Sequence, residues 1–584
     1  MEKISIRPNG SGADLLGRVT ELFGAQEFAD AMWTISDPGQ ALAVDEVCVE
    51  LTQLVGAGLR RYSASAGARL DVDAGHWEDL ASILELLAAR APPKEVLVAL
   101  LASAEQLRSA EEEEAFLLIT ETLGKCLRRL SSRQKAVCSG EVLKQLSSYL
   151  DALPKPAVYM LEGAELDGLC LSEDAQRLRR CLEATLEFAQ QLLEDNNTTG
   201  NCARAVFGPA QTSKLNGQLS DYFLRTIKSS LACVDFCETS HYPSDFRPLA
   251  ERLIGMGARL TATQLVFDWA DEDAALVAAY FVHVRGVDAE LPRVYGREFL
   301  LDRALAASAV SLSRSSTAPP AVVDKTLALL AALVASVEGP PWLSVRLRDR
   351  RQQALFAGCL FVMQSSPHVD IRRRALSLFG LAVAKYDWPS QVDVLFFLWE
   401  RCCREPAAPV GGSEGWLYTN RSNVLGWLMD TFRGKLAEEV RRPRLPAEDV
   451  GPFQSSLPRA LPLFLGVEWL LVDGGGVLDN YDRLSAGLSL LQFLFLKGET
   501  LLVDWRRQRW LGPAFLEPLR DALDAALNSG ALEPTKSRSA DADDDDDDDE
   551  LMSSSGTRVV EDSLTSVQLL QSRLEAVEQA RQCR

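Results

Sequence analysis

The sequence predicts an all-α protein, an irregular solenoid of paired helices of the HEAT or armadillo kind. Three observations support this prediction. Apolar residues recur at three- and four-residue spacing along nearly all of the 584 residues, which places them on one face of successive helices. Alternation with a period of two, which marks a half-buried strand, is almost absent. The helical runs come in pairs of about 35–45 residues, and one such pair cannot bury its apolar face without stacked neighbours.

The N-terminal part of the chain reads as a series of helical hairpins. Residues 1–12 carry no apolar pattern and are predicted to be disordered. Residues 13–312 form the predicted N-terminal repeats, and the polar run at 196–200 is expected to end one of their helices. After an amphipathic start from Ala13, helices are predicted at 77–89, 93–107, 115–130, 140–153, 174–194, 215–238, 246–260, 271–284 and 297–312.

A second group of hairpins follows a short connection. Residues 313–321, SRSSTAPPA, are rich in Ser and Pro and are expected to form a loop or linker. Residues 322–532 are predicted to be C-terminal HEAT-like repeats and the partner-binding half of the protein. Outside the hairpin at 367–399, their helices are expected at 322–337, 343–364, 420–440, 458–472, 479–497 and 513–527.

The hairpin at 367–399 has the clearest pattern. Its first helix is expected to start at Asp370 as a cap, after Pro367. A break is predicted at 387–390 because Pro389 cannot sit in a helix interior. A more apolar helix then covers 392–399. The expected buried face of the first helix consists of Ile371, Ala375, Leu376, Phe379, Ala382 and Val383.

The end of the chain contains an acidic block followed by an amphipathic run. Residues 533–556 include the unbroken acidic run 543–550, which repels itself and is predicted to be disordered. Residues 557–584 are predicted to hold a C-terminal capping helix with Leu564, Val567, Leu570, Leu574 and Val577 on one face. We favour docking of this helix onto the last repeat, and a free partner-binding helix is the alternative.

Composition excludes several classes of function. The chain has 82 acidic and 61 basic residues and a net charge of −21, which disfavours nucleic acid as a partner. No apolar run is long enough to span a membrane and no apolar signal core opens the chain. The 12 cysteines are scattered through apolar helices, singly except for the adjacent Cys402 and Cys403, as in reduced cytoplasmic or nuclear proteins. We therefore expect a cytoplasmic and nuclear protein that is monomeric by itself.

Residue patterns for catalysis or metal binding are weak. Cys233, Cys237 and His241 share helical spacing, but zinc needs a fourth ligand and none lies near. The paired Cys402 and Cys403 have no companion spacing for a metal. The glycine runs at 411–412 and 474–476 lack the lysine and spacing of a phosphate-binding loop. We expect no catalytic residue, no metal and no cofactor.

Clustered basic residues stand out against the acidic background. Arg372, Arg373 and Arg374 lie together, and a second group spans 421–444 and is followed by Arg459. A basic patch could face an acidic partner surface. Ordinary placement of cations near helix C-termini is the alternative, and we favour it for residues 372–374. For the second group both interpretations stay open. That group consists of Arg421, Arg433, Lys435, Arg441, Arg442 and Arg444.

Several short elements, in the same order and spacing, resemble the glomulin family and its plant counterpart, the aberrant lateral root formation protein. Residues 480–498 resemble an Asp-Arg helix of that family, and 515–519 its Phe-Leu-x-Pro-Leu element. Residues 567–578 resemble its terminal helix. Upstream, 93–97 and 245–247 are similar to its Pro-Lys-Glu-Leu-Leu and Pro-Phe-Arg elements, and 371–382 to a repeat helix. The acidic block and the 416–423 loop have no counterpart.

The resemblance implies a non-catalytic HEAT-like protein. Family members bind the RING-box subunit of cullin–RING ubiquitin ligases and cover the surface that receives the ubiquitin-conjugating enzyme. In plants the family is linked to auxin response and lateral root formation. The expected partners are therefore a RING-box protein and a cullin, bound through the C-terminal repeats. The candidate contact residues are Trp416, Arg421, Asn423, Arg433, Arg441, Arg442 and Arg483.

Two other classes of function remain as alternatives. The chain could be a generic HEAT-repeat adaptor or scaffold for another protein partner. It could also be an enzyme with an unrecognised site, although convergent polar groups of the kind that an active site requires are not evident in the sequence.

Overall fold

The computed structural model describes residues 11–65, 73–156, 172–203, 209–235, 246–261, 265–288, 291, 295–314, 318–404, 414–441, 451–466, 477–478, 480–497, 511–528 and 553–582. Across these ranges the chain is almost entirely helical and contains no β-strand. A single isolated bridge joins Trp342 and Tyr386. The predicted fold class, an all-α helical-repeat solenoid, is confirmed.

The chain divides into two compact units. Unit 1 comprises Met1–Ala307 and Pro319–Ala332, and unit 2 comprises Ser308–Ala318 and Leu333–Arg584. The helices α14 (Arg297–Ser313) and α15 (Pro320–Ser336) each supply residues to both units.

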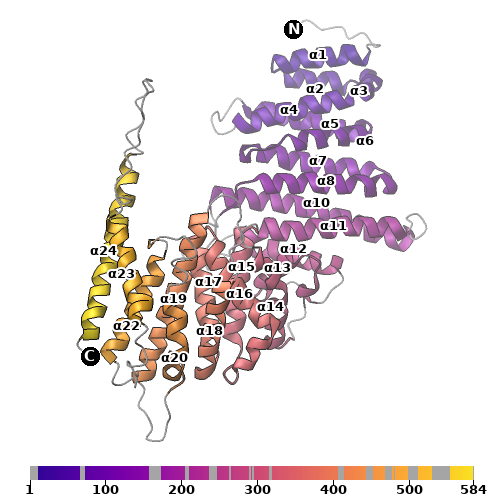
Figure 1. Ribbon diagram of the computed structural model, residues 1–584. Helices are drawn as coiled ribbons and strands as arrows, with labels where there is room; N and C mark the ends of the chain where they lie inside the picture. The colour runs from indigo at the N-terminus through magenta and orange to yellow at the C-terminus, as the bar shows by residue number, and fades with distance from the viewer. Residues whose placement is uncertain are drawn as a thin grey trace, which may run out of the picture. The chain divides into compact units, whose positions relative to one another are not determined.

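The helices of unit 1 stack in two layers (Figure 1). One layer contains α2, α5, α7 and α10 as successive neighbours, and the other contains α4, α6, α8 and α11. The elements before α14 are α1 (Gly12–Gly24), α2 (Phe28–Ser36), η1 (Pro38–Gln40), α3 (Ala41–Glu46), α4 (Cys48–Ser65), α5 (Asp73–Arg90), α6 (Pro93–Glu105), η2 (Ala110–Glu112), α7 (Glu113–Arg129), α8 (Ser132–Ala152), α10 (Glu173–Ala203), α11 (Pro209–Ser229), η3 (Leu231–Cys233), α12 (Arg247–Thr261), η4 (Val266–Asp268) and α13 (Glu272–His283).

Local signals set the helix starts and crossings in unit 1. Ser11 and Asp14 form a capping box at the start of α1. Pro93 occupies the first turn of α6, where its missing N–H costs no helical hydrogen bond. Gly56 lies where α4 crosses α6, and a Cβ there would come within 2.4 Å of Ser103 Oγ. The crossing therefore requires a residue without a side chain.

A buried charge cluster joins the segment just after η3 to α15 within unit 1. Asp235 is 5% exposed and Lys325 is 2% exposed, and Lys325 Nζ donates to Asp235 Oδ2. Tyr280 Oη donates to the same oxygen at 2.7 Å, and Arg285 Nε lies 2.8 Å from Asp235 Oδ1. Burial raises the pKa of this carboxyl, but Lys325 and Arg285 outweigh burial and hold the pKa below its usual range.

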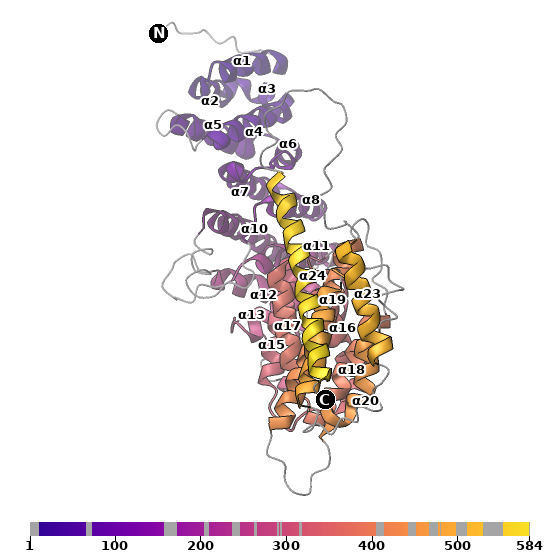
Figure 2. The ribbon, with the colours of Figure 1, turned by 60° about the vertical axis from the view of Figure 1, so that its left-hand side comes forward.

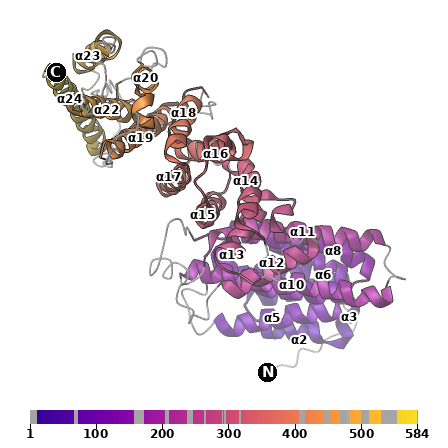
Figure 3. The same ribbon diagram turned by 90° about the horizontal axis from the view of Figure 1, so that it is seen from below.

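Unit 2 packs its helices around a run of aromatic side chains. Figure 3 looks roughly along several of these helices. Phe464 is buried and its ring contacts three other buried rings, those of Phe396, Trp399 and Phe432. The elements after α15 are η5 (Ser344–Arg348), α16 (Arg350–Ser365), α17 (Val369–Ala384), α18 (Trp388–Arg404), α19 (Glu414–Arg441), α20 (Pro452–Leu465), α22 (Tyr481–Lys497), the π-helical turn η6 (Gly512–Leu516), α23 (Glu517–Asn528) and α24 (Ser553–Gln582).

The hairpin α17–α18 differs from its prediction at both ends of the turn. The predicted cap at Asp370 is wrong, because His368 occupies the N-cap and Asp370 lies in the first turn, paired with Arg373 at 3.2 Å. The break lies at 385–387 and not at 387–390. Pro389 falls in the first turn of α18, where proline is tolerated. Leu378 is buried, whereas Leu376 is half-buried.

Three other predicted helices are also corrected. The helix α10 continues through residues 196–200 to Ala203. The run 343–364 is two elements, because Asp349 caps α16 by accepting a hydrogen bond from Arg351 N at 2.9 Å. The helix α20 starts at Pro452 and contains Pro458 and Pro462 in its interior. Proline disfavours a helix interior, but the packing of the apolar face of α20 outweighs this preference. Four residues of that face are buried, namely Phe453, Leu457, Leu461 and Phe464.

The last helix packs onto its neighbours in unit 2. In Figure 1 and Figure 2, α24 runs beside α23, and it also contacts α22. Arg573 Nη1 donates to the hydroxyls of Ser485 and Ser489 at 2.7 and 2.8 Å. The predicted apolar face is buried at Val567, Leu570, Leu574 and Val577, so this helix is docked and not free.

Candidate functional site

The candidate contact residues in unit 2 lie mainly on α19, whose position is fixed by a close backbone crossing. A Cβ at Gly426 would lie 2.7 Å from the carbonyl oxygen of Asp482 and 2.8 Å from its carbon. Backbone atoms cannot move aside as a flexible side chain does. Only glycine therefore allows α19 to pack this closely on the start of α22.

A buried carboxylate holds the other end of α19. Glu439 is 9% exposed and accepts hydrogen bonds from Phe453 N at 2.9 Å and Gln454 N at 3.0 Å. It also accepts one from Trp388 Nε1 at 3.0 Å. The N–H groups of Phe453 and Gln454 lie in the first turn of α20, where no carbonyl of the same helix is available to accept their hydrogen bonds. One side chain thereby ties α18, α19 and α20 together.

The candidate contact residues whose side chains are at least partly exposed lie at intervals along α19. Asn423 and Arg441 are exposed, and Arg433 is half-buried and pairs with Asp430 at 3.0 Å. Asn423 and Arg441 are 18 residues apart, so they project in the same direction about 27 Å from each other. Arg433 points about 80° away from that direction at 100° per residue. The three residues form an elongated strip and not a compact patch.

The remaining candidates are not on that strip. Arg483 is 4% exposed, and its guanidinium lies over the Trp399 ring at 5.1 Å from the ring centroid. Its backbone N–H donates to Ser422 Oγ at 3.4 Å. The structure therefore places Arg483 in the core. Trp416 and Arg421 belong to α19 but their side chains are outside the description, and Arg442 lies outside the described residues.

Most of the other predicted basic residues have intramolecular roles. Lys435 Nζ lies 4.9 Å from the Trp388 ring centroid and 3.6 Å from Glu438. Arg459 lies over the Phe396 ring at 4.3 Å and pairs with Glu400 at 3.1 Å. Such cation–π contacts stabilise by about 0.5–2 kcal/mol. Both groups thus contribute to packing between helices of unit 2.

Arg372 on α17 follows the interpretation favoured from the sequence. Arg372 Nη1 donates to the carbonyls of Ser366 and Pro367 at 2.8 and 3.2 Å, just after α16 ends. Carbonyls at a helix C-terminus lack intrahelical donors and attract cations. Arg373 is occupied by its pair with Asp370. Arg444 lies outside the described residues.

Carboxylates accompany the basic groups on this face. Burial raises the pKa of Asp482, and the negative charge of Asp430 raises it further. Asp430 in turn pairs with Arg433. The strip along α19 is thus of mixed charge, as the polar rim of a protein interface is. Sequence reasoning missed Glu439 and Asp482, because their roles depend on which helices meet.

The cysteine and glycine motifs define no reactive centre in the part of the chain that the structure describes. Cys233 is buried and its Sγ donates to Ser229 O at 3.2 Å, and burial raises its pKa. Cys237, His241 and both glycine-rich motifs lie outside the described residues. Cys402 is buried and Cys403 exposed. Among the described side chains, no cluster of three or more His, Cys, Asp or Glu is arranged to hold a metal ion. Nor does any described helix have the length and apolar character to cross a membrane.

Fold and surface together define a class of protein, a helical-repeat protein with an elongated mixed-charge face. Glomulin from Homo sapiens is 25% identical to this chain over 76% of it and 72% of the relative. Glomulin from Mus musculus is 24% identical over the same shares. These two relatives support assignment of the chain to the glomulin family.

Two further comparisons add little. No protein-family model matches the chain. A solved circular tandem repeat protein with novel repeat topology and enhanced subunit contact surfaces aligns with 98% of this chain and 99% of its own, at 15% identity and a TM-score of 0.19. That score is too low to support a shared arrangement of helices.

Proposed function

We propose that this protein is a non-catalytic regulator that binds the RING-box subunit of cullin–RING ubiquitin ligases and restrains ubiquitination. The bound regulator would mask the surface that the ubiquitin-conjugating enzyme uses. The observation that supports the proposal is the similarity to glomulin over three quarters of the chain. We place this activity in the cytoplasm and nucleus, and in a plant we connect it to auxin-dependent lateral root formation.

The exposed face of α19 in unit 2 supports this proposal as the contact surface. The exposed or half-buried Asn423, Arg433 and Arg441 extend along α19 with carboxylates between them. The crossing at Gly426 and the buried Glu439 hold that helix in place before a partner arrives. A rigid surface binds with little ordering cost, and masking requires only that inhibitor and conjugating enzyme share one site.

Reconstituted ubiquitin-chain synthesis tests the proposal directly. A purified cullin–RING ligase, with and without this protein, should make fewer chains in its presence, and the RING-box and cullin subunits should co-purify with it. An unchanged rate together with no co-purification would instead favour an adaptor for another protein.

Charge reversal on α19 tests the proposed contact. The triple variant R433E, R441E and R442E should weaken RING-box binding by about tenfold, because rim charges set the electrostatic complementarity of an interface. Arg18, Lys94 and Arg133 are exposed basic residues of unit 1, and their reversal to Glu provides a control with the same change in net charge. Equal binding by the two triple variants, both folded, would remove these arginines from the interface.

A further inference from the structure

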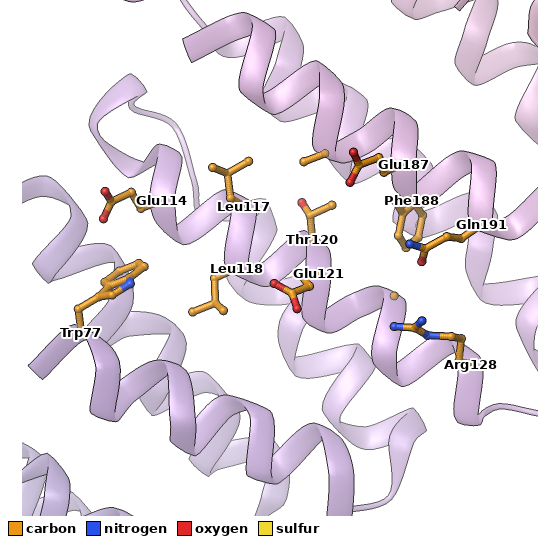
Figure 4. A pocket seen from close by; sticks show the side chains of 12 residues that line it. Trp77, Glu114, Leu117, Leu118, Thr120, Glu121, Arg128, Glu187, Phe188 and Gln191 are labelled. Carbon is orange, nitrogen blue, oxygen red and sulfur yellow. The ribbon is translucent and has the colours of Figure 1, made fainter. Parts of the chain in front are cut away.

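Unit 1 contains a groove that the proposed function does not use. The helix α7 forms its floor, and α5 and α10 form its walls (Figure 4). The groove encloses about 550 Å³ and is open to solvent along the outer face of α7. The candidate contact residues for the RING-box subunit all belong to unit 2, so this groove belongs to a different surface.

The groove has an apolar lining at positions where side chains remain partly accessible. Trp77 on α5 and the adjacent Leu117 and Leu118 on α7 are half-buried. Phe188 on α10 closes the opposite side. A Cβ at Gly124 would make only ordinary contact with Phe188, at 3.6 Å. The absent side chain at Gly124 thus leaves the space between α7 and α10 open.

The charges along the groove are mainly negative. Glu114, Glu121 and Glu187 line it with a single basic residue, Arg128. Figure 4 shows Glu114 beside Trp77 at one end and Arg128 at the other. Within the described residues Glu114 and Glu187 are exposed and form no ion pair. Lys125 forms ion pairs with both Glu121 and Glu85, and its Nζ lies 2.9 Å from the Glu121 carboxylate.

We infer that this groove docks a short basic segment of a partner protein, one that carries Lys or Arg beside an apolar side chain. Carboxylates along the groove repel nucleic acid and acidic peptides and attract cations. A cationic side chain at the end formed by Trp77 and Glu114 would meet an aromatic face and a carboxylate together, a favoured environment for Lys and Arg. Leu117 and Leu118 then receive the apolar neighbour, as pockets in peptide grooves do.

A displayed library of short random peptides, selected against the full-length protein, tests this inference. Enriched peptides should share a Lys or Arg next to Leu, Ile, Met or Phe. Their affinity, measured by fluorescence anisotropy, should fall about tenfold in the variant E114K/E187K and should also fall as salt is raised, because exposed charges are screened.

Two further variants separate docking from unfolding. Glu50 and Glu105 are exposed residues of α4 and α6 that do not line the groove, so E50K/E105K carries the same charge change and should bind peptide as the unchanged protein does. The variant L117A/L118A removes the apolar anchor without adding charge and should also weaken binding. Failure to enrich any peptide, enrichment of acidic or uncharged peptides, or equal binding by E114K/E187K and E50K/E105K would each overturn the inference.

Discussion

At the residue scale, Glu439 shows how one buried carboxylate can hold three helices. It accepts two backbone N–H groups at the start of α20 and the indole N–H of Trp388. The variant E439A leaves these donors without an acceptor in the interior. We expect it to lower the free energy of unfolding by about 2–3 kcal/mol, because hydrogen bonds to charged groups are the stronger ones and unsatisfied buried donors are costly. Urea denaturation measures this change.

The variant E439Q separates the loss of hydrogen bonding from the loss of volume. Glutamine keeps one acceptor oxygen and nearly the same shape, but it brings an amide NH₂ toward other donors. It should therefore destabilise the protein less than E439A. If E439A is as stable as the unchanged protein, the carboxylate is not what positions α20.

Asp235 gives a prediction that depends on pH. Its pKa is lower in the folded protein than in the unfolded chain, because Lys325 and Arg285 outweigh burial. The unfolded state therefore binds more protons at acidic pH, and stability rises with pH over that range. The contribution of Asp235 is fully present above the unfolded carboxyl pKa of about 3.9. It is lost as the pH falls through the lower folded value.

The variant D235N checks this sign. At pH 7 it leaves the buried Lys325 without its carboxylate, and breaking a buried pair typically costs about 3–5 kcal/mol. The difference in unfolding free energy between D235N and the unchanged protein should stay constant from pH 7 to about pH 4 and shrink below it. A difference that grows on acidification would contradict the assigned direction of the pKa shift.

At the element scale, the crossing of α19 and α22 depends on a missing side chain. G426A would place a methyl group within 2.8 Å of the backbone at Asp482. The helices must then separate, and overpacking of this kind costs about 1–3 kcal/mol. G434A is the matched control on the same helix, because no atom lies within 4 Å of its Cβ position. It should stabilise α19 by up to about 1 kcal/mol.

Thermal denaturation of the two variants gives the comparison. Both changes replace glycine by alanine in one helix, so propensity alone predicts the same stabilising direction for each. An opposite sign at Gly426 would isolate the effect of the close approach. Equal melting temperatures for both variants would show that α19 and α22 can move apart without loss.

Helix periodicity predicts elements better than it predicts their ends. The apolar stripe of α17 follows from its sequence at Ile371, Ala375, Phe379, Ala382 and Val383, all buried. The start of α20 cannot be predicted in this way, because Pro458 in the sequence suggests that a helix begins there. The structure shows that α20 begins at Pro452, where the Glu439 side chain accepts a hydrogen bond from its first turn. The continuation of α10 through its polar run likewise opposes local propensity.

At the scale of the whole molecule, the candidate site shows the same limit. The sequence shows where the basic residues are along the chain, but it does not show which side chains they contact in the folded protein. Lys435 and Arg459 lie over aromatic rings from other helices, and Arg483 is in the core. Which charges stay on the surface depends on contacts between residues far apart in the chain. A single sequence without structure cannot separate Asn423 or Arg441, which are exposed, from these packed cations.

The proposed masking makes a quantitative prediction for the inhibition of chain synthesis. If this protein and the conjugating enzyme compete for one RING surface, each lowers the other's occupancy, and inhibition follows the ratio of their concentrations to their dissociation constants. The concentration of this protein that halves chain synthesis should therefore rise linearly with the concentration of conjugating enzyme. Titrations at several enzyme concentrations measure this slope. A half-inhibitory concentration that stays constant would mean that the two proteins bind the ligase at separate sites, and restraint would then require a conformational change in the ligase.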